Sequence, residues 1–206
     1  MRQIPGIIKR FWKTPVWRMN PSEKVIYLTF DDGPNPIVTP RVLDILDRYD
    51  AKATFFCVGE NVAKYPEIFE EVKKRGHAVG NHTYNHLKGN ENSLSYYVEN
   101  VKKADEIISS PLFRPPHGRI SLKQAKALKK DYKIIMWDFI TYDYDKRVTQ
   151  SEIVPEVKKK SRNGSIVVFH DSLKAEKNVL SALPRVLDFL TKEGYEMRAL
   201  IIDDKK

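Results

Sequence analysis

Cysteine is almost absent from this chain. Cys57 is the only one among 206 residues, so no disulfide can form within the chain, and the cysteine content says nothing about the redox state of its compartment. It lies in the apolar run from Thr54 to Val58, where we expect a small buried residue instead of a reactive thiol or a ligand. Internal repeats and low-complexity tracts are also lacking, which argues against a solenoid.

Long hydrophobic runs are missing as well. No stretch approaches the roughly 20 apolar residues that span a bilayer, so we expect no transmembrane segment. Near the start, Ile7 and Ile8 are followed at once by Lys9 and Arg10, which leaves no apolar core for a signal peptide. We therefore expect a location in the cytoplasm or at the periphery of the inner membrane.

Residues 7–19 mix basic side chains with isoleucine, phenylalanine and tryptophan. Two interpretations stay open. The segment could lie on a membrane surface as an amphipathic contact, although Pro15 weakens the helix that this requires. Alternatively, it is an extension that packs on the domain and buries its aromatic rings.

The net charge of +9 attracts nucleic acids, anionic membranes and acidic polymers alike. The lysines are spread over the whole chain, mostly within helical patterns, and no basic module with interleaved aromatic residues accompanies them. We therefore expect no nucleic-acid partner. The length fits one well-packed domain, which we place at residues 21–206 after an N-terminal extension at residues 1–20, and we expect a monomer.

Short β-branched or aromatic runs alternate with helical patterns from Pro21 onward, which is typical of repeated β-α units. Seven strands are predicted, at Val25–Thr29, Thr54–Val58, His77–Gly80, Leu112–Arg114, Ile134–Trp137, Ile166–Phe169 and Glu196–Ile202. Six helices are predicted, at Thr39–Tyr49, Val62–Arg75, Ser93–Ser109, Ser121–Asp131, Ser151–Ser161 and Val179–Lys192. Gly76 and Gly194 follow helical patterns, as glycines that end helices do.

Polar residues with useful chemistry fall at or just after the C-terminal ends of these strands. They are Asp31, Asp32, His82, His86, Arg114, His117, Asp143 and His170. In a parallel β/α barrel these strand ends form one rim, where active sites are assembled from separate loops. The pattern therefore predicts an α/β fold in which these residues converge.

Two aspartates and two histidines in this set have the composition of a metal site. One carboxylate and the imidazoles of His82 and His86 make three ligands with open positions, as in hydrolytic zinc centres. The second carboxylate is then free to act as a general base. Taken singly, an Asp-Asp-Gly turn or two histidines four residues apart are ordinary features.

Three further residues extend the predicted site. His117 lies in a loop stiffened by Pro115 and Pro116, and His170 ends an apolar strand, where it is poised to exchange protons near neutral pH. Arg114, in the same stiff loop, is expected to meet a carboxylate, with Asp31 as the candidate.

Taken in order, the motifs resemble those of polysaccharide deacetylases, the carbohydrate esterase family four domain that is also called the NodB-homology domain. The resemblance covers residues 25–202. It is carried by TFDDGP at Thr29–Pro34, HTxxH at His82–His86, RPPxG at Arg114–Gly118, WDxxxxDx at Trp137–Tyr144 and VxH at Val168–His170.

The resemblance implies a deformed, incomplete (β/α)7-type barrel with the active site at the C-terminal ends of its strands. It implies that Asp32, His82 and His86 bind a divalent metal, usually zinc, with cobalt, nickel or manganese as alternatives. It further implies that Asp31 is the base, that Arg114 tethers this base, and that the His117 backbone N–H stabilises the oxyanion. His170 would be the general acid and Asp143 would orient it.

This chain departs from the family pattern in the predicted substrate pocket. His117 stands where the family has tyrosine, next to Pro116, and Ile140 stands where it has aspartate. Tyr144 replaces a tryptophan that walls the acetyl-methyl pocket, and Val168 replaces a leucine. No expected ligand, acid or base is lost.

The resemblance implies a metal-dependent hydrolase that removes N-acetyl groups from a glycan of N-acetylhexosamines, with peptidoglycan or chitin-like oligomers as substrates. Two alternatives remain. The same chemistry would serve an O-acetyl esterase that acts on a polysaccharide. The departures in the pocket leave room for a low-turnover glycan-binding protein that retains the metal site.

Overall fold

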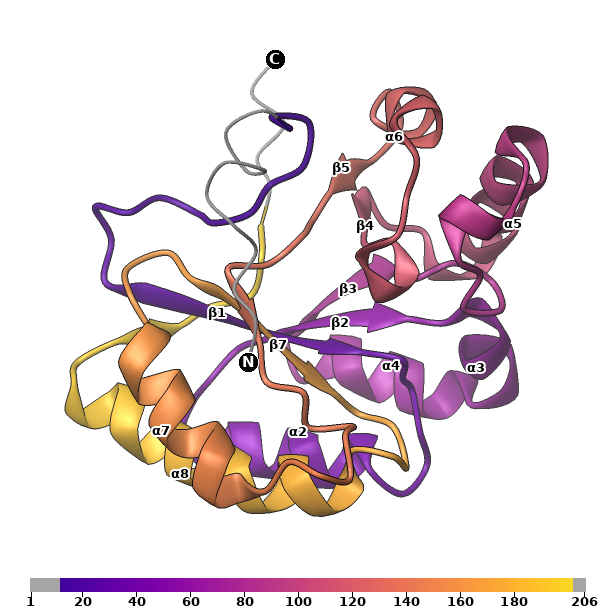
Figure 1. Ribbon diagram of the computed structural model, residues 1–206. Coiled ribbons are helices and arrows are strands. Elements are labelled where there is room, and N and C mark those ends of the chain that lie inside the picture. The colour runs from indigo at the N-terminus through magenta and orange to yellow at the C-terminus, as the bar shows by residue number, and fades with distance from the viewer. Residues whose placement is uncertain (1–11, 202–206) are drawn as a thin grey trace.

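Residues 12–201 are described by the computed structural model, and their strands form a curved, parallel sheet (Figure 1). The main path runs in the order β5-β4-β3-β2-β1-β7-β6, and β8 pairs with β1 beside this path. The bounds are β1 Val25–Asp31, β2 Thr54–Cys57, β3 Ala78–Asn81, β4 Leu112–Phe113, β5 Lys133–Ile134, β6 Phe139–Ile140, β7 Ile166–His170 and β8 Glu196–Met197. The sheet is an incomplete barrel, as the sequence predicted.

One predicted strand is corrected. The run at Ile134–Trp137 does not form a single strand, because β5 ends at Ile134 and a separate strand, β6, follows at Phe139–Ile140 and pairs with β7. The short β6 was missed because two paired residues carry no periodicity of their own. The last strand is also shorter than predicted, since β8 ends at Met197, while Ile202 lies outside the described residues.

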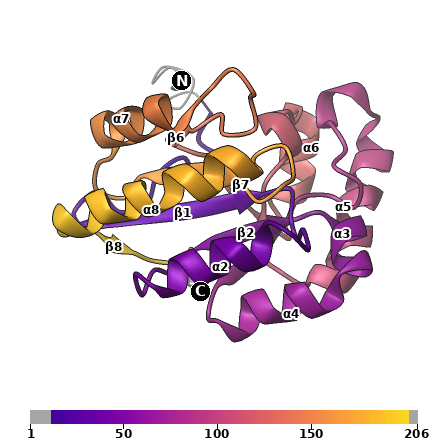
Figure 2. The same ribbon diagram turned by 90° about the horizontal axis from the view of Figure 1, so that it is seen from below.

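Helices cover the outer face of the sheet, where Figure 2 shows α2, α8 and α4 from below. Their bounds are α2 Thr39–Asp47, α3 Gly59–Lys64, α4 Pro66–Lys74, α5 Leu94–Ile108, α6 Leu122–Leu128, α7 Gln150–Lys160 and α8 Glu176–Lys192, with short 3₁₀ turns η1 Gly89–Glu91 and η2 Pro116–Gly118. The single helix predicted at Val62–Arg75 is broken at Tyr65. Pro66 has no N–H to donate and starts α4 instead.

The largest part of the core lies between the sheet and these helices. All seven residues of β1 are buried, as expected for a central parallel strand that is covered on both faces. Its outer side chains Ile26, Leu28 and Phe30 pack against the apolar face of α8, which includes Leu183 and Leu187. Burying each such side chain contributes roughly 1.5–3 kcal/mol. This packing makes β1, and the residues at its end, a rigid base for the site.

The segment before β1 is part of the barrel. Val16 forms a parallel bridge with Ile135, and Arg18 forms an antiparallel bridge with Ser165, so the chain crosses from the end of β5 to the start of β7. Trp17 is buried in the same cluster as Trp137. For residues 12–19 the packed alternative therefore holds, and Trp17 is not available to a membrane surface. Residues 7–11 of the predicted membrane contact lie outside the described residues.

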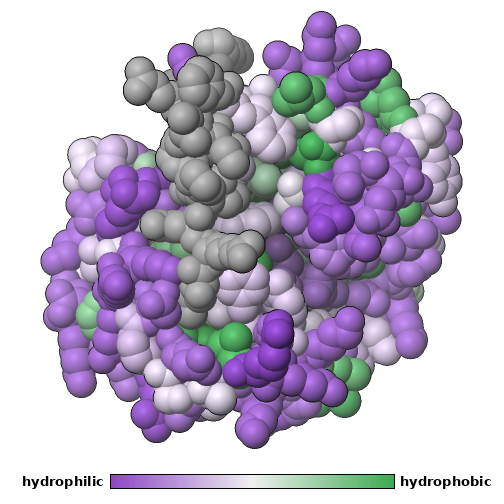
Figure 3. All heavy atoms as spheres, in the orientation of Figure 1, coloured by the Kyte–Doolittle hydropathy of each residue, from purple (hydrophilic) through white to green (hydrophobic). Residues whose placement is uncertain are grey.

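Figure 3 shows a face that is mostly hydrophilic, with hydrophobic residues in small separate patches. Within residues 12–201, no helix combines the length and the apolar composition that crossing a bilayer requires.

Candidate metal centre

Strand register explains how the site comes together. β1 and β7 are parallel neighbours in which Asp31 is the partner of His170. Paired residues in adjacent parallel strands point to the same face, about 4.8 Å apart. On the other side of β1, β3 and β4 end at Asn81 and Phe113, which are also partners, so His82 and Arg114 follow at the same edge. The predicted convergence at the strand ends is confirmed.

Asp32, His82 and His86 form a three-residue cluster whose ligand atoms all lie within 4.8 Å of one another. The Asp32 Oδ1 atom is 3.1 Å from the His86 Nε2 atom and 3.7 Å from the His82 Nε2 atom. These spacings let three donors turn toward one ion, so the residues fit the divalent metal that the sequence predicted.

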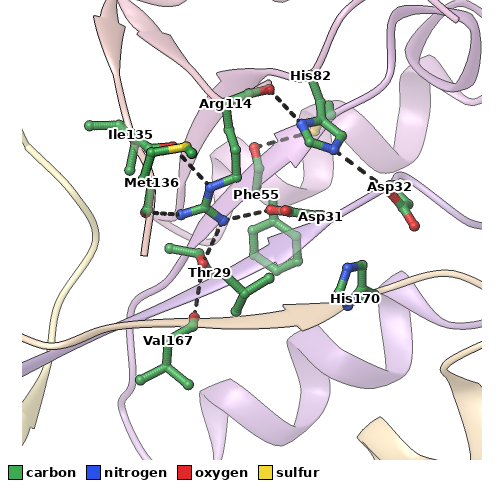
Figure 4. A network of polar contacts seen from close by, with 12 residues as sticks. Thr29, Asp31, Asp32, Phe55, His82, Arg114, Ile135, Met136, Val167 and His170 are labelled. Carbon is green, nitrogen blue, oxygen red and sulfur yellow. Dashed lines mark hydrogen bonds and ion pairs between the residues drawn. The ribbon is translucent and has the colours of Figure 1, made fainter. Parts of the chain in front are cut away.

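The hydrogen bonding of His82 favours the form that binds a metal. Its Nδ1 atom lies 2.7 Å from the carbonyl oxygen of Arg114. A carbonyl can only accept, so Nδ1 carries the proton and Nε2 presents its lone pair toward Asp32 (Figure 4). Burial lowers the pKa of His82 to about 4, which keeps the ring neutral.

The second aspartate has a different environment. Asp31 is buried, and its Oδ1 atom accepts a hydrogen bond of 2.7 Å from the Arg114 Nη1 atom. Arg114 is fully buried, and it also donates to the Thr29 hydroxyl and to the carbonyls of Ile135 and Met136 (Figure 4). The predicted contact between Arg114 and Asp31 is therefore present, in a guanidinium whose position is set by the surrounding backbone.

Arg114 thus holds two parts of the site at once. Its side chain fixes Asp31, while its carbonyl fixes His82. The sequence predicted only the first of these contacts, because a backbone carbonyl has no signature in the residue types.

His170 and Asp143 form the opposite side of the site. One Asp143 oxygen is 2.8 Å from the His170 Nδ1 atom, and the other accepts the His170 backbone N–H at 2.8 Å. Burial of His170 opposes its protonation, but the Asp143 carboxylate, helped by Asp32 and Asp31, raises the pKa of His170 to about 9. The pairing that the resemblance implied is present, and it leaves His170 protonated at neutral pH.

The predicted pocket residues lie around this centre at different depths. His117 is exposed, and its ring contacts the His86 ring edge-on, with the ring centroids 4.7 Å apart. Pro116 beside it is buried. Tyr144 is partly exposed, and its ring contacts the His170 ring edge-on, with the ring centroids 4.7 Å apart. Val168 is fully buried, two residues before His170 on β7.

Several supporting residues were not predicted. The Asn61 side chain donates to the Asp32 carbonyl, and the Asn178 side chain donates to the carbonyls of Asp143 and Val148. The Thr39 hydroxyl donates to Asp171, the residue that directly follows His170. An asparagine or threonine in a helix carries no signal for such a contact, since only the tertiary fold brings it to its partner.

A curved parallel sheet with a cluster of carboxylates and imidazoles at its C-terminal edge defines a β/α-barrel enzyme with its site at that edge. A family model for polysaccharide deacetylase matches residues 18–134. The chain therefore belongs to the polysaccharide deacetylase family of enzymes.

Named relatives of the chain support this family assignment. A peptidoglycan-N-acetylglucosamine deacetylase of Bacillus cereus is 38% identical over 187 residues, which cover 87% of this chain and 87% of that protein. The peptidoglycan-N-acetylmuramic acid deacetylase PdaC of Bacillus subtilis is 32% identical over 87% of this chain and 38% of its own length. The solved structure of the Bc1960 peptidoglycan N-acetylglucosamine deacetylase superposes with a TM-score of 0.86, at 30% identity and over 89% of each chain.

Proposed function

We propose that this protein is a metal-dependent hydrolase that removes N-acetyl groups from an N-acetylhexosamine glycan of the peptidoglycan or chitin type. One observation carries the proposal. The Asp32, His82 and His86 donors lie at the same strand ends as a buried carboxylate held by an arginine and a histidine held by a second carboxylate. Two relatives are named as deacetylases of peptidoglycan sugars, and these names support the proposed substrate class.

Amide hydrolysis requires that water add to the carbonyl carbon and that the nitrogen leave as an amine. A divalent cation held by Asp32, His82 and His86 would polarise the acetyl carbonyl and acidify a water molecule. We propose zinc as this cation, because one carboxylate and two imidazoles with an open position are typical of catalytic zinc sites. Asp31 takes the proton of the attacking water. Arg114 engages Oδ1 of Asp31, which leaves Oδ2 for that proton.

His170 supplies the second proton. Its Nδ1 atom faces Asp143, so Nε2 carries the proton that passes to the leaving nitrogen as the C–N bond breaks. The His117 backbone N–H is the proposed donor to the oxyanion. In its support, no acceptor within residues 12–201 pairs with this N–H.

Release of acetate and free amine from N-acetylglucosamine oligomers and from peptidoglycan fragments tests the proposed function. We expect both products from the zinc-loaded protein, complete loss of activity after chelation, and recovery when zinc is added back. Acetylxylan is the comparison that separates an amide hydrolase from an ester hydrolase. Glycan binding without any acetate release, or release from acetylxylan alone, would contradict the proposal.

The pH profile tests the assignment of the acid. Because His170 must be protonated, kcat/KM should fall on the alkaline side as His170 loses its proton. A cation at Asp32 offsets the charge of that carboxylate, so this fall should lie below the pKa of about 9. Asp143→Asn removes a carboxylate that raises the pKa, and should move the alkaline limb to lower pH by roughly 1–3 units.

Asp145→Asn is the matched control for this profile. Asp145 lies two residues further along the same loop, but its carboxylate pairs with Arg147 and not with His170. The alkaline limb of the Asp145→Asn profile should stay at the wild-type pH. An alkaline limb that Asp143→Asn leaves in place would show that another group supplies the proton.

A further inference from the structure

Asp171 is a buried carboxyl group that the proposed mechanism does not use. It follows His170 directly, and only 1% of its surface is exposed. Its Oδ2 atom accepts a hydrogen bond of 2.6 Å from the Thr39 hydroxyl, whereas its Oδ1 atom has no partner within the described residues. A buried polar atom without a partner is unfavourable for folding. An apolar side chain would avoid that cost, which indicates that the carboxyl group makes a contact that compensates for it.

The carboxyl group lies directly against Gly33. A methyl group added at Gly33 would sit 2.0 Å from the Asp171 Oδ2 atom, far inside van der Waals contact. Gly33 is not among the residues with positive φ, so a left-handed backbone does not explain the glycine. Its absent side chain instead lets the backbone that follows Asp32 rest on the Asp171 carboxyl group.

Hydrogen bonds connect Asp171 to both ends of the same loop. Its backbone N–H donates to the Asp31 carbonyl at 3.1 Å. Its carboxyl group accepts from the Thr39 hydroxyl, whose oxygen in turn accepts the Asn35 backbone N–H at 2.7 Å. The loop from Asp31 to Asn35 is therefore held at its start, its middle and its end by one residue.

Asp32 lies within this loop in a costly conformation. Its φ is 81°, in the left-handed region that residues with a side chain avoid, so the backbone is strained at this residue. A strained residue keeps its conformation only where its surroundings hold it. In this conformation the Asp32 carboxylate lies close to His82 and His86.

We infer that Asp171 is a positioning residue that, through Gly33 and Thr39, holds Asp32 in the conformation that a metal ligand requires. The inference rests on the proposed metal site and adds a residue to it from outside the ligand set. The contacts concern shape and hydrogen bonding, so an amide in place of the carboxyl group should serve. Asparagine keeps an oxygen for the Thr39 hydroxyl and the volume beneath Gly33.

The test is zinc affinity, measured by competition with a chromophoric chelator on folded protein. Asp171→Ala and Thr39→Val should each weaken zinc binding by roughly 10–100-fold, the usual effect of removing a residue that orients a ligand. Asp171→Asn and Thr39→Ser should bind zinc within about threefold of the wild type. The double variant Asp171→Ala/Thr39→Val should be no weaker than the worse single variant, because the two residues act in one chain of contacts.

Thr191→Val, at the end of α8, is the matched control for loss of a threonine hydroxyl, and circular dichroism verifies that each variant is folded. Wild-type zinc affinity in folded Asp171→Ala and Thr39→Val would overturn the positioning role alone. Loss of affinity in Asp171→Asn equal to that in Asp171→Ala would overturn it in favour of a role for the charge. Absence of zinc binding by the wild type would overturn both this inference and the proposed function.

Discussion

Asp31→Asn is expected to lower kcat by roughly 10²–10⁴-fold, the usual contribution of a general base, while the zinc content per chain stays at the wild-type level. The amide cannot take the proton of the attacking water. Its oxygen can still accept the hydrogen bond from Arg114, so the arrangement of the site should survive. Acetate release and metal analysis on the same preparation measure the two quantities separately.

Asp32→Asn is the paired variant, since it is the neighbouring residue with the opposite proposed role. It should lose zinc, because a neutral amide is a much poorer ligand than a carboxylate. If Asp31→Asn loses the metal and Asp32→Asn retains it, the roles of the two aspartates are exchanged. Full activity in Asp31→Asn would remove Asp31 from the mechanism.

Among the variants proposed here, Arg114→Met should lose the most stability, about 3–5 kcal/mol in the free energy of unfolding. The arginine side chain is fully buried, and its removal leaves the Asp31 carboxylate without a partner in a medium that solvates charge poorly. The carbonyls of Ile135 and Met136 lose their donors as well. Urea unfolding at neutral pH measures the change.

Two further variants identify the cause of that loss. The double variant Asp31→Asn/Arg114→Met should be more stable than Arg114→Met, because the unpaired buried charge is gone. Arg41→Met is the control for loss of an exposed arginine. Its pair with Glu176 is solvent-exposed, so the change should be within about 1 kcal/mol. A similar loss in both arginine variants would mean that burial of the pair does not matter.

The residue types alone were enough to locate most of the site. Asp31, His82, Arg114 and His170 follow apolar runs that read as strands, and parallel strands bring their C-terminal ends to one edge. The expected pairs between Arg114 and Asp31 and between Asp143 and His170 are both present. A charged residue that is buried needs a partner of opposite charge, and the chain offers few candidates at that edge.

Regions with weak local patterns were predicted less well. The two residues of β6 could not be recognised, and Tyr65 interrupts what looked like one helix. The alternative roles of residues 12–19 were separated only by packing, which buries Trp17 beside Trp137. An amphipathic segment has the same composition whether its apolar side faces a membrane or a neighbouring strand.

The sequence by itself therefore determined the alternation of strands and helices except around β6 and Tyr65, the set of residues at the rim and the family to which they belong. Only the tertiary structure decided how those residues are held. The Arg114 carbonyl selects the His82 tautomer, and Asp171, just after the end of β7 and more than a hundred residues further along the chain, supports Gly33. Such contacts depend on backbone atoms and on close approach, and neither leaves a pattern in the residue types.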